Sequence, residues 1–213
     1  MNRRAFLQLS MSLAACANRS SEPGAAPDGA VGTPLPALVS HRPLLVYFSR
    51  AGENYYNGGR RTLTVGNTEV AATMIHDALA CDVHRIQPTV PYSDSYDDTV
   101  GRNVREQNEN ARPVIANLPA NIDRYDTILL GSPIWNVRAP RIMLTFVERF
   151  DFTGKRIFPF TTFAVSGLGQ VVAEYTSACH GATLGEALAI RGEEVDESRP
   201  AIQGWLRRVG LLA

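Results

Sequence analysis

Residues 47–72 read YFSRAGENYYNGGRRTLTVGNTEVAA. The segment starts as a short apolar strand that runs into a glycine turn, and it finishes as the beginning of a helix. A stretch rich in Gly, Asn and Arg separates the two and is too long for an ordinary strand-to-helix turn. The sequence therefore predicts a strand–helix unit whose connecting turn carries an insertion.

The composition is that of one globular domain with a sizeable core. The chain has 213 residues, of which 45% are hydrophobic, and its formal net charge is zero. Because there is no basic excess, we expect no nucleic-acid partner. The apolar runs are too short to span a membrane as a helix.

The N-terminus has the pattern of an export signal. The opening MNRRAFLQLS carries Arg3-Arg4 ahead of a short apolar run, which is typical of twin-arginine export. The run ends in LAAC (13–16), which resembles a bacterial lipobox. The resemblance implies cleavage before Cys16 and lipidation of that cysteine. The alternative is a plain apolar N-terminus with an incidental cysteine.

These features predict three parts. We expect an export signal at 1–15, a flexible tether at 16–42 and a folded domain at 43–213. The tether is expected because its Ser, Pro, Gly and Ala content cannot bury a core. The predicted location is extracytoplasmic, anchored to the membrane of a bacterial cell envelope.

Apolar strand patterns alternate with helical patterns along the domain. Strands are expected at 43–49, 82–88, 125–133 and 155–169, with a last strand within 182–192. Helices are expected at 67–80, 139–152, 170–179 and 198–210, and the mostly polar segment 96–113 is expected to have a helical core. Asn67 or Thr68 is a natural N-cap for the first helix. Such alternation predicts a parallel sheet covered on both faces, with a ligand site beyond the carboxyl ends of the strands.

Three segments resemble the flavodoxin-like superfamily, and especially its short members with a GxPIW loop. They are SRAG (49–52) together with NT (67–68), GSPIWNVRAP (131–140) and AVSGLGQ (164–170). The resemblance covers roughly residues 43–210. It implies an α/β, doubly wound, five-stranded parallel sheet in the order 2-1-3-4-5, with FMN as the cofactor.

The chemistry of these segments suits a flavin phosphate and ring. Hydroxyl, amide and backbone N–H groups at a helix start can bind a phosphate, and an apolar wall with small residues at its edge can hold a flat ring. The candidate cofactor-binding residues are Ser49, Arg50, Ala51, Gly52, Asn67, Thr68, Pro133, Ile134, Trp135, Asn136, Ser166, Gly167 and Gly169. Trp135 could instead be a core residue, and Ser166-Gly167 a simple tight turn. We predict no catalytic residue and no metal site, because the histidines lack ligand spacing.

The insertion at about 53–65 splits the phosphate loop of the resemblance into two halves. Asn57-Gly58-Gly59 is a hairpin turn signal, and residues 61–65 alternate polar and apolar side chains. We therefore expect a small hairpin beside the flavin, with Tyr55 and Tyr56 as candidates to pack over the site. The alternative is an irregular surface loop.

The resulting hypothesis is an exported, lipid-anchored FMN protein that exchanges electrons with a partner protein or a small acceptor. One alternative is an FMN-dependent NAD(P)H reductase of a quinone or other small acceptor. Another is a flavodoxin-like binding module without flavin. Cys81 and Cys179 are expected near opposite edges of the sheet, too far apart for a disulfide.

Overall fold

The computed structural model describes residues 42–213. The predicted export signal, Cys16 and all but the last residue of the predicted tether lie outside this range, so their assignments stay predictions. Within residues 42–213, no helix is both long and apolar enough to cross a membrane.

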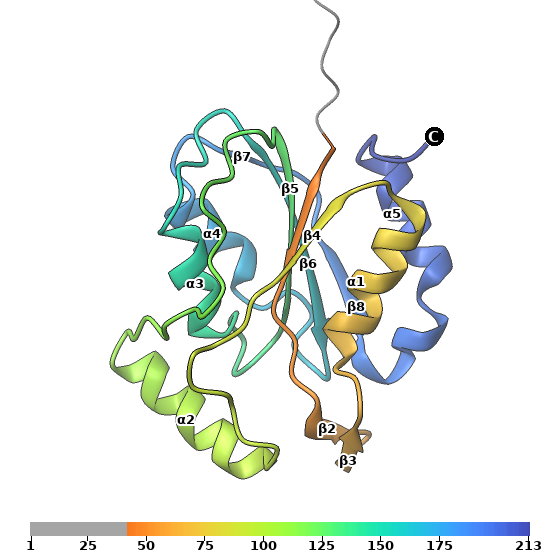
Figure 1. The fold of residues 1–213 in the computed structure, drawn as a ribbon. Coiled ribbons are helices and arrows are strands. Elements are labelled where there is room, and N and C mark those ends of the chain that lie inside the picture. Colours follow the sequence, from red (N-terminus) through yellow and green to blue (C-terminus); the bar gives the residue numbers. More distant parts are fainter. Residues whose placement is uncertain (1–41) are drawn as a thin grey trace, which may run out of the picture. The chain divides into compact units, whose positions relative to one another are not determined.

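A parallel sheet forms the centre of the domain (Figure 1). Its strands, in spatial order, are β4 (Asp82–Arg85), β1 (Leu44–Tyr47), β5 (Thr127–Pro133), β6 (Arg156–Phe163) and then β7 (Thr183–Leu184) and β8 (Leu188–Arg191), which both pair with β6. Counted along the chain, with the hairpin left out and β7 and β8 taken together as the fifth strand, this is the predicted order 2-1-3-4-5, which is therefore confirmed. β1 is buried along its whole length, as is nearly all of β5, which explains their continuous apolar runs.

The last strand, expected within 182–192, is two short strands rather than one. It is divided into β7 and β8, with Gly185 between them. A Cβ atom on Gly185 would overlap the ring of Phe158, so the chain passes close to β6 there. A hydrogen bond also holds the segment between β7 and β8, since the indole N–H of Trp205 donates to the carbonyl of Glu186 at 2.9 Å.

Helices cover both faces of the sheet (Figure 1). One face packs against α1 (Asn67–Ala78) and α5 (Arg199–Arg208), and the other against α3 (Arg141–Val147) and α4 (Val171–Ala178). A 3₁₀ helix, η1 (Gly192–Glu197), precedes α5 and was not predicted. α3 is shorter than the predicted 139–152 and begins after Pro140, which is its N-cap.

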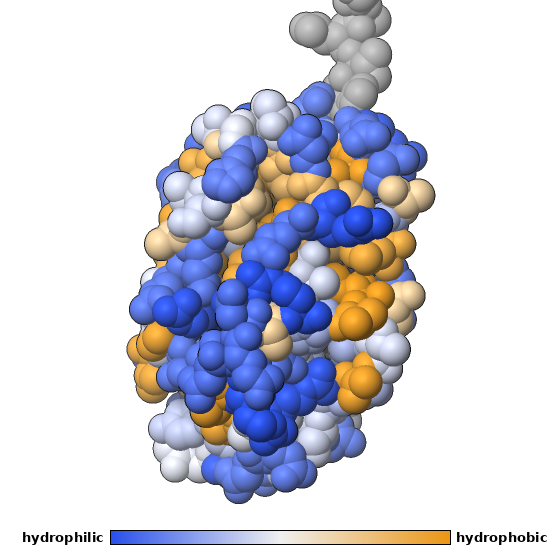
Figure 2. All heavy atoms as spheres, turned by 90° about the vertical axis from the view of Figure 1, so that its left-hand side faces the viewer, coloured by the Kyte–Doolittle hydropathy of each residue, from blue (hydrophilic) through white to orange (hydrophobic). Residues whose placement is uncertain are grey.

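Helix α2 (Tyr96–Asn108) stands apart from these layers. It lies at the same end of the molecule as the hairpin (Figure 1) and has Thr99, Asn103 and Glu106 as its buried residues. Figure 2 faces the left-hand side of Figure 1, where α2 lies. The lower part of that side has mostly hydrophilic residues, with hydrophobic residues in separate patches. The inward face of α2 is thus polar, which is unusual for a helix that packs on a core.

The insertion is a two-stranded antiparallel hairpin, as predicted, made of β2 (Gly52–Tyr56) and β3 (Gly59–Leu63). Asn57 and Gly58 form its turn with φ values of 47° and 82°. Two consecutive residues with positive φ are the mark of a type I′ turn, which Asn-Gly favours. The alternative of an irregular loop is excluded.

The predicted N-cap of α1 is wrong. The cap position belongs to Gly66, and Asn67 and Thr68 are the first residues of the helix. The Ser49 hydroxyl, which comes from the end of β1, accepts a hydrogen bond from the Glu69 backbone N–H at 3.1 Å. A side chain distant in sequence therefore performs the capping that local residues were expected to perform.

Cys81 and Cys179 are free and buried, which confirms the prediction that they form no disulfide. Burial raises the pKa of the Cys81 thiol to about 11 and that of the Cys179 thiol to about 12. Both thiols are therefore neutral near pH 7 and lack the thiolate character of reactive cysteines.

Candidate functional site

A cavity of about 590 Å³ opens at the carboxyl ends of β1, β5 and β6. Its wall is built by the ends of these strands and by the hairpin, the start of α1, α2 and the start of η1. The position is the switch point of the strand order, where parallel sheets of this kind bind ligands. The volume lies within the range of small-molecule sites.

One end of the cavity is a cradle of small polar groups. Ser49, Asn67 and Thr68 line it, and the Thr68 hydroxyl lies 2.7 Å from the Thr162 hydroxyl. A Cβ atom on Gly66 would overlap the Ser49 hydroxyl and the Arg50 carbonyl. The two halves of the split loop therefore meet in space, and the contact requires glycine at position 66.

This cradle fits a phosphate group. The amides of Asn67 and Thr68 belong to the first turn of α1, where backbone N–H groups precede the intrahelical bonds and favour an anion. The Ser49 oxygen already accepts a hydrogen bond from Glu69, so its own O–H hydrogen is free to point into the cavity.

The other end of the cavity is aromatic. Trp135 lines it, and its indole meets the rings of Phe48 and Tyr92 edge-on, with centroid distances of 5.6 and 4.9 Å. Trp135 also packs against the core cluster on this side of the sheet. The two interpretations of Trp135, core residue and ring wall, are therefore compatible.

The position of Trp135 depends on a buried polar contact behind it. The Tyr92 hydroxyl donates to Glu106 at 2.9 Å, and Arg102 Nε donates to the same carboxylate at 2.6 Å. Burial, followed by the nearby Glu106 charge, raises the pKa of Tyr92, so the phenol stays protonated. Tyr92 is thus a fixed neutral donor that ties the aromatic wall to α2.

A tight turn at 135–138 presents Trp135 to the cavity. Backbone bonds join Trp135 and Arg138 in both directions, at 2.9 and 3.2 Å, and Asn136 and Val137 have φ values of 50° and 60°. This backbone conformation is strained for a β-branched residue such as Val137. Two contacts hold the turn: Asn136 donates to Gln107 Oε1 at 2.8 Å, and the Val137 carbonyl accepts from the Gln170 N–H at 2.7 Å.

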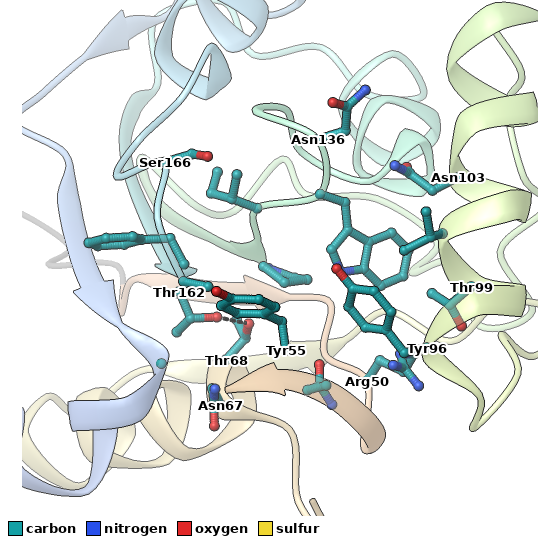
Figure 3. Close-up of a pocket in the computed structure, with 18 of the residues that line it drawn as sticks. Arg50, Tyr55, Asn67, Thr68, Tyr96, Thr99, Asn103, Asn136, Thr162 and Ser166 are labelled. Carbon is teal, nitrogen blue, oxygen red and sulfur yellow. Dashed lines mark hydrogen bonds between the residues drawn. The ribbon is translucent and has the colours of Figure 1, made fainter. Parts of the chain in front are cut away.

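The hairpin and α2 close the cavity from one side. Figure 3 shows Tyr55 and Tyr96 at the cavity, with Thr99 and Asn103 on the α2 side. The two elements are joined directly. The Tyr96 N–H donates to Glu53 at 3.2 Å, and Arg60 pairs with Asp97 at 2.9 Å while lying 3.6 Å from the centroid of the Tyr96 ring.

Arg50 lies in the wall but is engaged by backbone oxygens. Its guanidinium donates to the Ser93 carbonyl at 2.9 Å and to the carbonyl of Glu53. Burial lowers its pKa, while the nearby acidic groups act in the opposite direction. Arg50 therefore braces the segment before α2 against the hairpin, and a direct cofactor contact remains a prediction.

The structure brings most of the predicted site residues to one cavity. The lining includes Ser49, Arg50, Asn67, Thr68, Pro133, Ile134, Trp135, Asn136 and Ser166. Ala51, Gly52, Gly167 and Gly169 lie outside this lining. Gly52, with φ of 81°, instead lets the hairpin pass Asp94, since a Cβ there would lie 2.8 Å from the Asp94 Cα. Gly169 packs against the Val137 carbonyl in the same way.

Sequence reasoning missed Tyr96, Thr99, Asn103, Thr162 and Glu193, which also line the cavity. No local signal identifies the members on α2, because the helix is mostly polar on its exposed side as well as on its buried one. Among residues 42–213, no group of three or more His, Cys, Asp or Glu side chains could hold a metal ion.

The family model described as flavodoxin matches residues 62–209. The chain belongs to the flavodoxin family. The match begins within β3, so membership in the flavodoxin family rests on α1 through α5, and Ser49 is placed in the cavity by the structure alone.

Solved structures agree with this assignment. A candidate flavoprotein from Bacteroides uniformis is 28% identical, with a TM-score of 0.62, over 78% of this chain and 97% of that chain. Another from Bacteroides eggerthii is 27% identical, with a TM-score of 0.64, over 79% and 97%. A Lactobacillus acidophilus flavoprotein in complex with FMN shares the fold at 16% identity and a TM-score of 0.54, over 74% and 98%. No curated protein matches the chain.

Proposed function

We propose that this protein binds FMN and transfers electrons through it. The observation that supports the proposal is the joining of a phosphate cradle (Ser49, Asn67 and Thr68) and an aromatic wall (Trp135) in one cavity at the switch point of the sheet. A ligand with a phosphate at one end and a flat ring at the other matches this polarity. The solved flavoprotein that contains FMN shares the fold and supports the choice of flavin.

Bound FMN supplies the redox chemistry, in steps of one or two electrons. The protein's part is to bind and orient. The amides that begin α1 and the Ser49 hydroxyl hold the phosphate, and Trp135 fixes the plane of the ring. The hairpin and α2 limit the access of water to that ring. The candidate redox partner is a protein or a small acceptor.

The first expected result is a preference for FMN over riboflavin. The refolded or purified protein should bind FMN at least about tenfold more tightly, because charge-assisted hydrogen bonds to the phosphate are each worth more than ~1.4 kcal/mol. Flavin fluorescence titration measures both affinities, and an absorbance spectrum of the protein shows the bound flavin. Equal affinities would contradict the phosphate cradle, and a colourless protein after reconstitution would favour a binding module without flavin.

A second candidate function is an NAD(P)H-dependent reductase of a quinone or other small acceptor. The cover formed by the hairpin and α2 favours it, since Tyr55 and Tyr96 give a small planar molecule aromatic surface to contact. Anaerobic mixing of the FMN-loaded protein with NADH or NADPH separates the two, because the reductase alone is reduced rapidly.

Export and lipid anchoring complete the proposal, and their support is the Arg3-Arg4 and LAAC (13–16) pattern. Wild-type protein should incorporate a labelled fatty acid and sediment with membranes, and Cys16→Ser should do neither. Incorporation unchanged by Cys16→Ser would place the lipid elsewhere, and no incorporation into the wild-type protein would overturn lipidation.

A further inference from the structure

Half of the large hydrophobic side chains that are exposed within residues 42–213 line the cavity. These are Tyr55, Val100, Val104, Val137 and Val165. The others are Val65, Val83, Val90, Val114 and Leu118, which lie outside the lining. Exposed apolar side chains are ordinary when they are scattered, whereas a group of them around one opening indicates a binding surface. We call the four valines of this lining the valine rim.

The valine rim follows the side of the cavity that lies opposite the phosphate cradle. Figure 3 shows Ser166, Asn136 and Asn103 along one side of the cavity, with Asn67 and Arg50 on the other side. Each of the first three residues has a rim valine beside it in the sequence. The rim therefore runs from the loop after β6, past the turn before α3, to α2, and three separate segments bring apolar side chains to one edge.

The charged groups of the cavity lie away from this rim. Among the lining residues in the described part of the chain, the charged ones are Arg50 and Glu193. Arg50 is on the opposite side (Figure 3) and is engaged by backbone carbonyls. Glu193 is joined to the hairpin, since its Oε1 accepts a hydrogen bond from the Asn57 N–H at 3.1 Å. The rim is therefore suited to an uncharged, apolar part of a ligand.

Val137 is held in the rim at an energetic cost that packing does not offset. Its φ of 60° is strained for a β-branched residue, and its side chain is 40% exposed, so burial contributes little in return. Glycine or asparagine would adopt this turn conformation with less strain. An exposed apolar side chain at a strained position of the cavity edge indicates contact with a ligand.

We propose that the valine rim binds the alkyl chain of a lipid-soluble quinone, whose ring enters the cavity and accepts electrons from the flavin. This inference rests on the proposed function, because it names the acceptor of the same site. Such a molecule has a planar ring, which Tyr55 and Tyr96 can contact, and an apolar chain that leaves through the opening where the rim lies. A dinucleotide matches the rim less well, because its phosphates find no cation there.

The reaction at this site is a two-electron transfer. The quinone gains two electrons and two protons from the reduced flavin, which is thereby oxidised, and leaves as the quinol. The donor of the proposed function, NAD(P)H or a partner protein, replaces the electrons. Each methylene group of the chain that the rim removes from water strengthens the binding of the quinone.

The test compares decylubiquinone with its parent quinone, which has the same substituted ring without the decyl chain. Each is mixed with the photoreduced, FMN-loaded protein, and the same reactions with free reduced FMN correct for the intrinsic reactivity of the two quinones. After this correction, the decyl compound should oxidise the protein at least about tenfold faster at equal low concentration. The burial of about two methylene groups corresponds to that factor.

Substitutions in the rim should remove this preference. Val165→Ser and Val104→Ser should each slow the decyl compound about fivefold and the parent quinone less than about twofold. Val114→Ser is the matched control, because Val114 is 68% exposed, close to the 77% of Val165, and lies outside the cavity lining. It should change neither rate, and FMN affinity should stay within about twofold in all three variants.

Two results would overturn the inference. Equal corrected rates for the two quinones with the wild-type protein would mean that the rim binds no alkyl chain. Rim variants that lose FMN affinity but keep the preference for the decyl compound would mean that the rim holds the flavin itself. The proposed function survives either result, provided that the protein binds FMN. A protein that binds no FMN would remove both the proposed function and this inference.

Discussion

Gly66→Ala should lower FMN affinity by about a hundredfold or more and remove most of the preference for FMN over riboflavin. The added Cβ overlaps the Ser49 hydroxyl and the Arg50 carbonyl, both part of the cradle wall. Neither can retreat easily, because the Ser49 hydroxyl caps Glu69 and the Arg50 backbone joins β1 to the hairpin. The loss corresponds to ~2.7 kcal/mol, close to two charge-assisted hydrogen bonds. Riboflavin, which lacks the phosphate, should lose much less.

The matched control is Gly204→Ala. A Cβ at Gly204 makes an ordinary contact, 3.5 Å from Arg208 Nη1, and the position lies within α5. Alanine should stabilise the helix there by about 0.5–1 kcal/mol and leave flavin affinity unchanged. Fluorescence titrations with both flavins and thermal melts of both variants complete the measurement. A folded Gly66→Ala variant that keeps its preference for FMN would place the phosphate outside this cradle.

The fold could be predicted where the physics is local. The apolar run at 44–47 is buried throughout, and the Asn57-Gly58 pair takes the positive φ values that its turn requires. The break at Gly185 could not be predicted, because its cause is the ring of Phe158 on the neighbouring strand. The predicted N-cap of α1 was wrong for a similar reason, because the capping group comes from a distant part of the chain. Local side chains at the helix start were available, but the Ser49 hydroxyl from β1 reached the amide instead.

The residues of the candidate site also fall into two groups, those that short local motifs identify and those that distant contacts bring to the cavity. Ser49, Thr68 and Trp135 could be identified because short motifs carry their chemistry, and all three line the cavity. Asn103 could not, since nothing local says that the polar side of α2 faces inward. Glu193 enters the wall from a distant part of the chain, so its presence depends on how η1 packs on α1. The sequence therefore predicted the two ends of the cavity and the hairpin part of its cover, including Tyr55, but not the parts formed by α2 and η1.

Removal of residues 53–65, so that Gly52 is followed by Gly66, should leave a folded domain with a few-fold weaker FMN affinity. β2 and β3 pair with each other and form a sheet separate from the central one, so the core loses no strand. The cavity loses the wall formed by Asn54 and Tyr55. α2 loses its Glu53 and Arg60 contacts, which accounts for the weaker binding.

The deletion should have a larger effect on the rate at which a small electron acceptor oxidises the reduced protein. Oxidation of the reduced, FMN-loaded variant by menadione, a small quinone, should slow about tenfold or more, because a planar acceptor loses an aromatic contact worth ~1 kcal/mol along with the cover that orients it. Ferricyanide needs no binding pocket and serves as the control oxidant, with a rate expected to stay within about twofold. Tyr55→Ala should reproduce much of the menadione effect. Tyr56→Ala should reproduce less, because Tyr56 points to the Glu193 carbonyl and lies outside the cavity lining.

If the shortened protein folds but no longer binds FMN, the hairpin belongs to the cofactor site and the two halves of the loop do not form one cradle. If neither affinity nor oxidation rate changes, the hairpin has no part in the chemistry, and the cover over the flavin is the work of α2 alone.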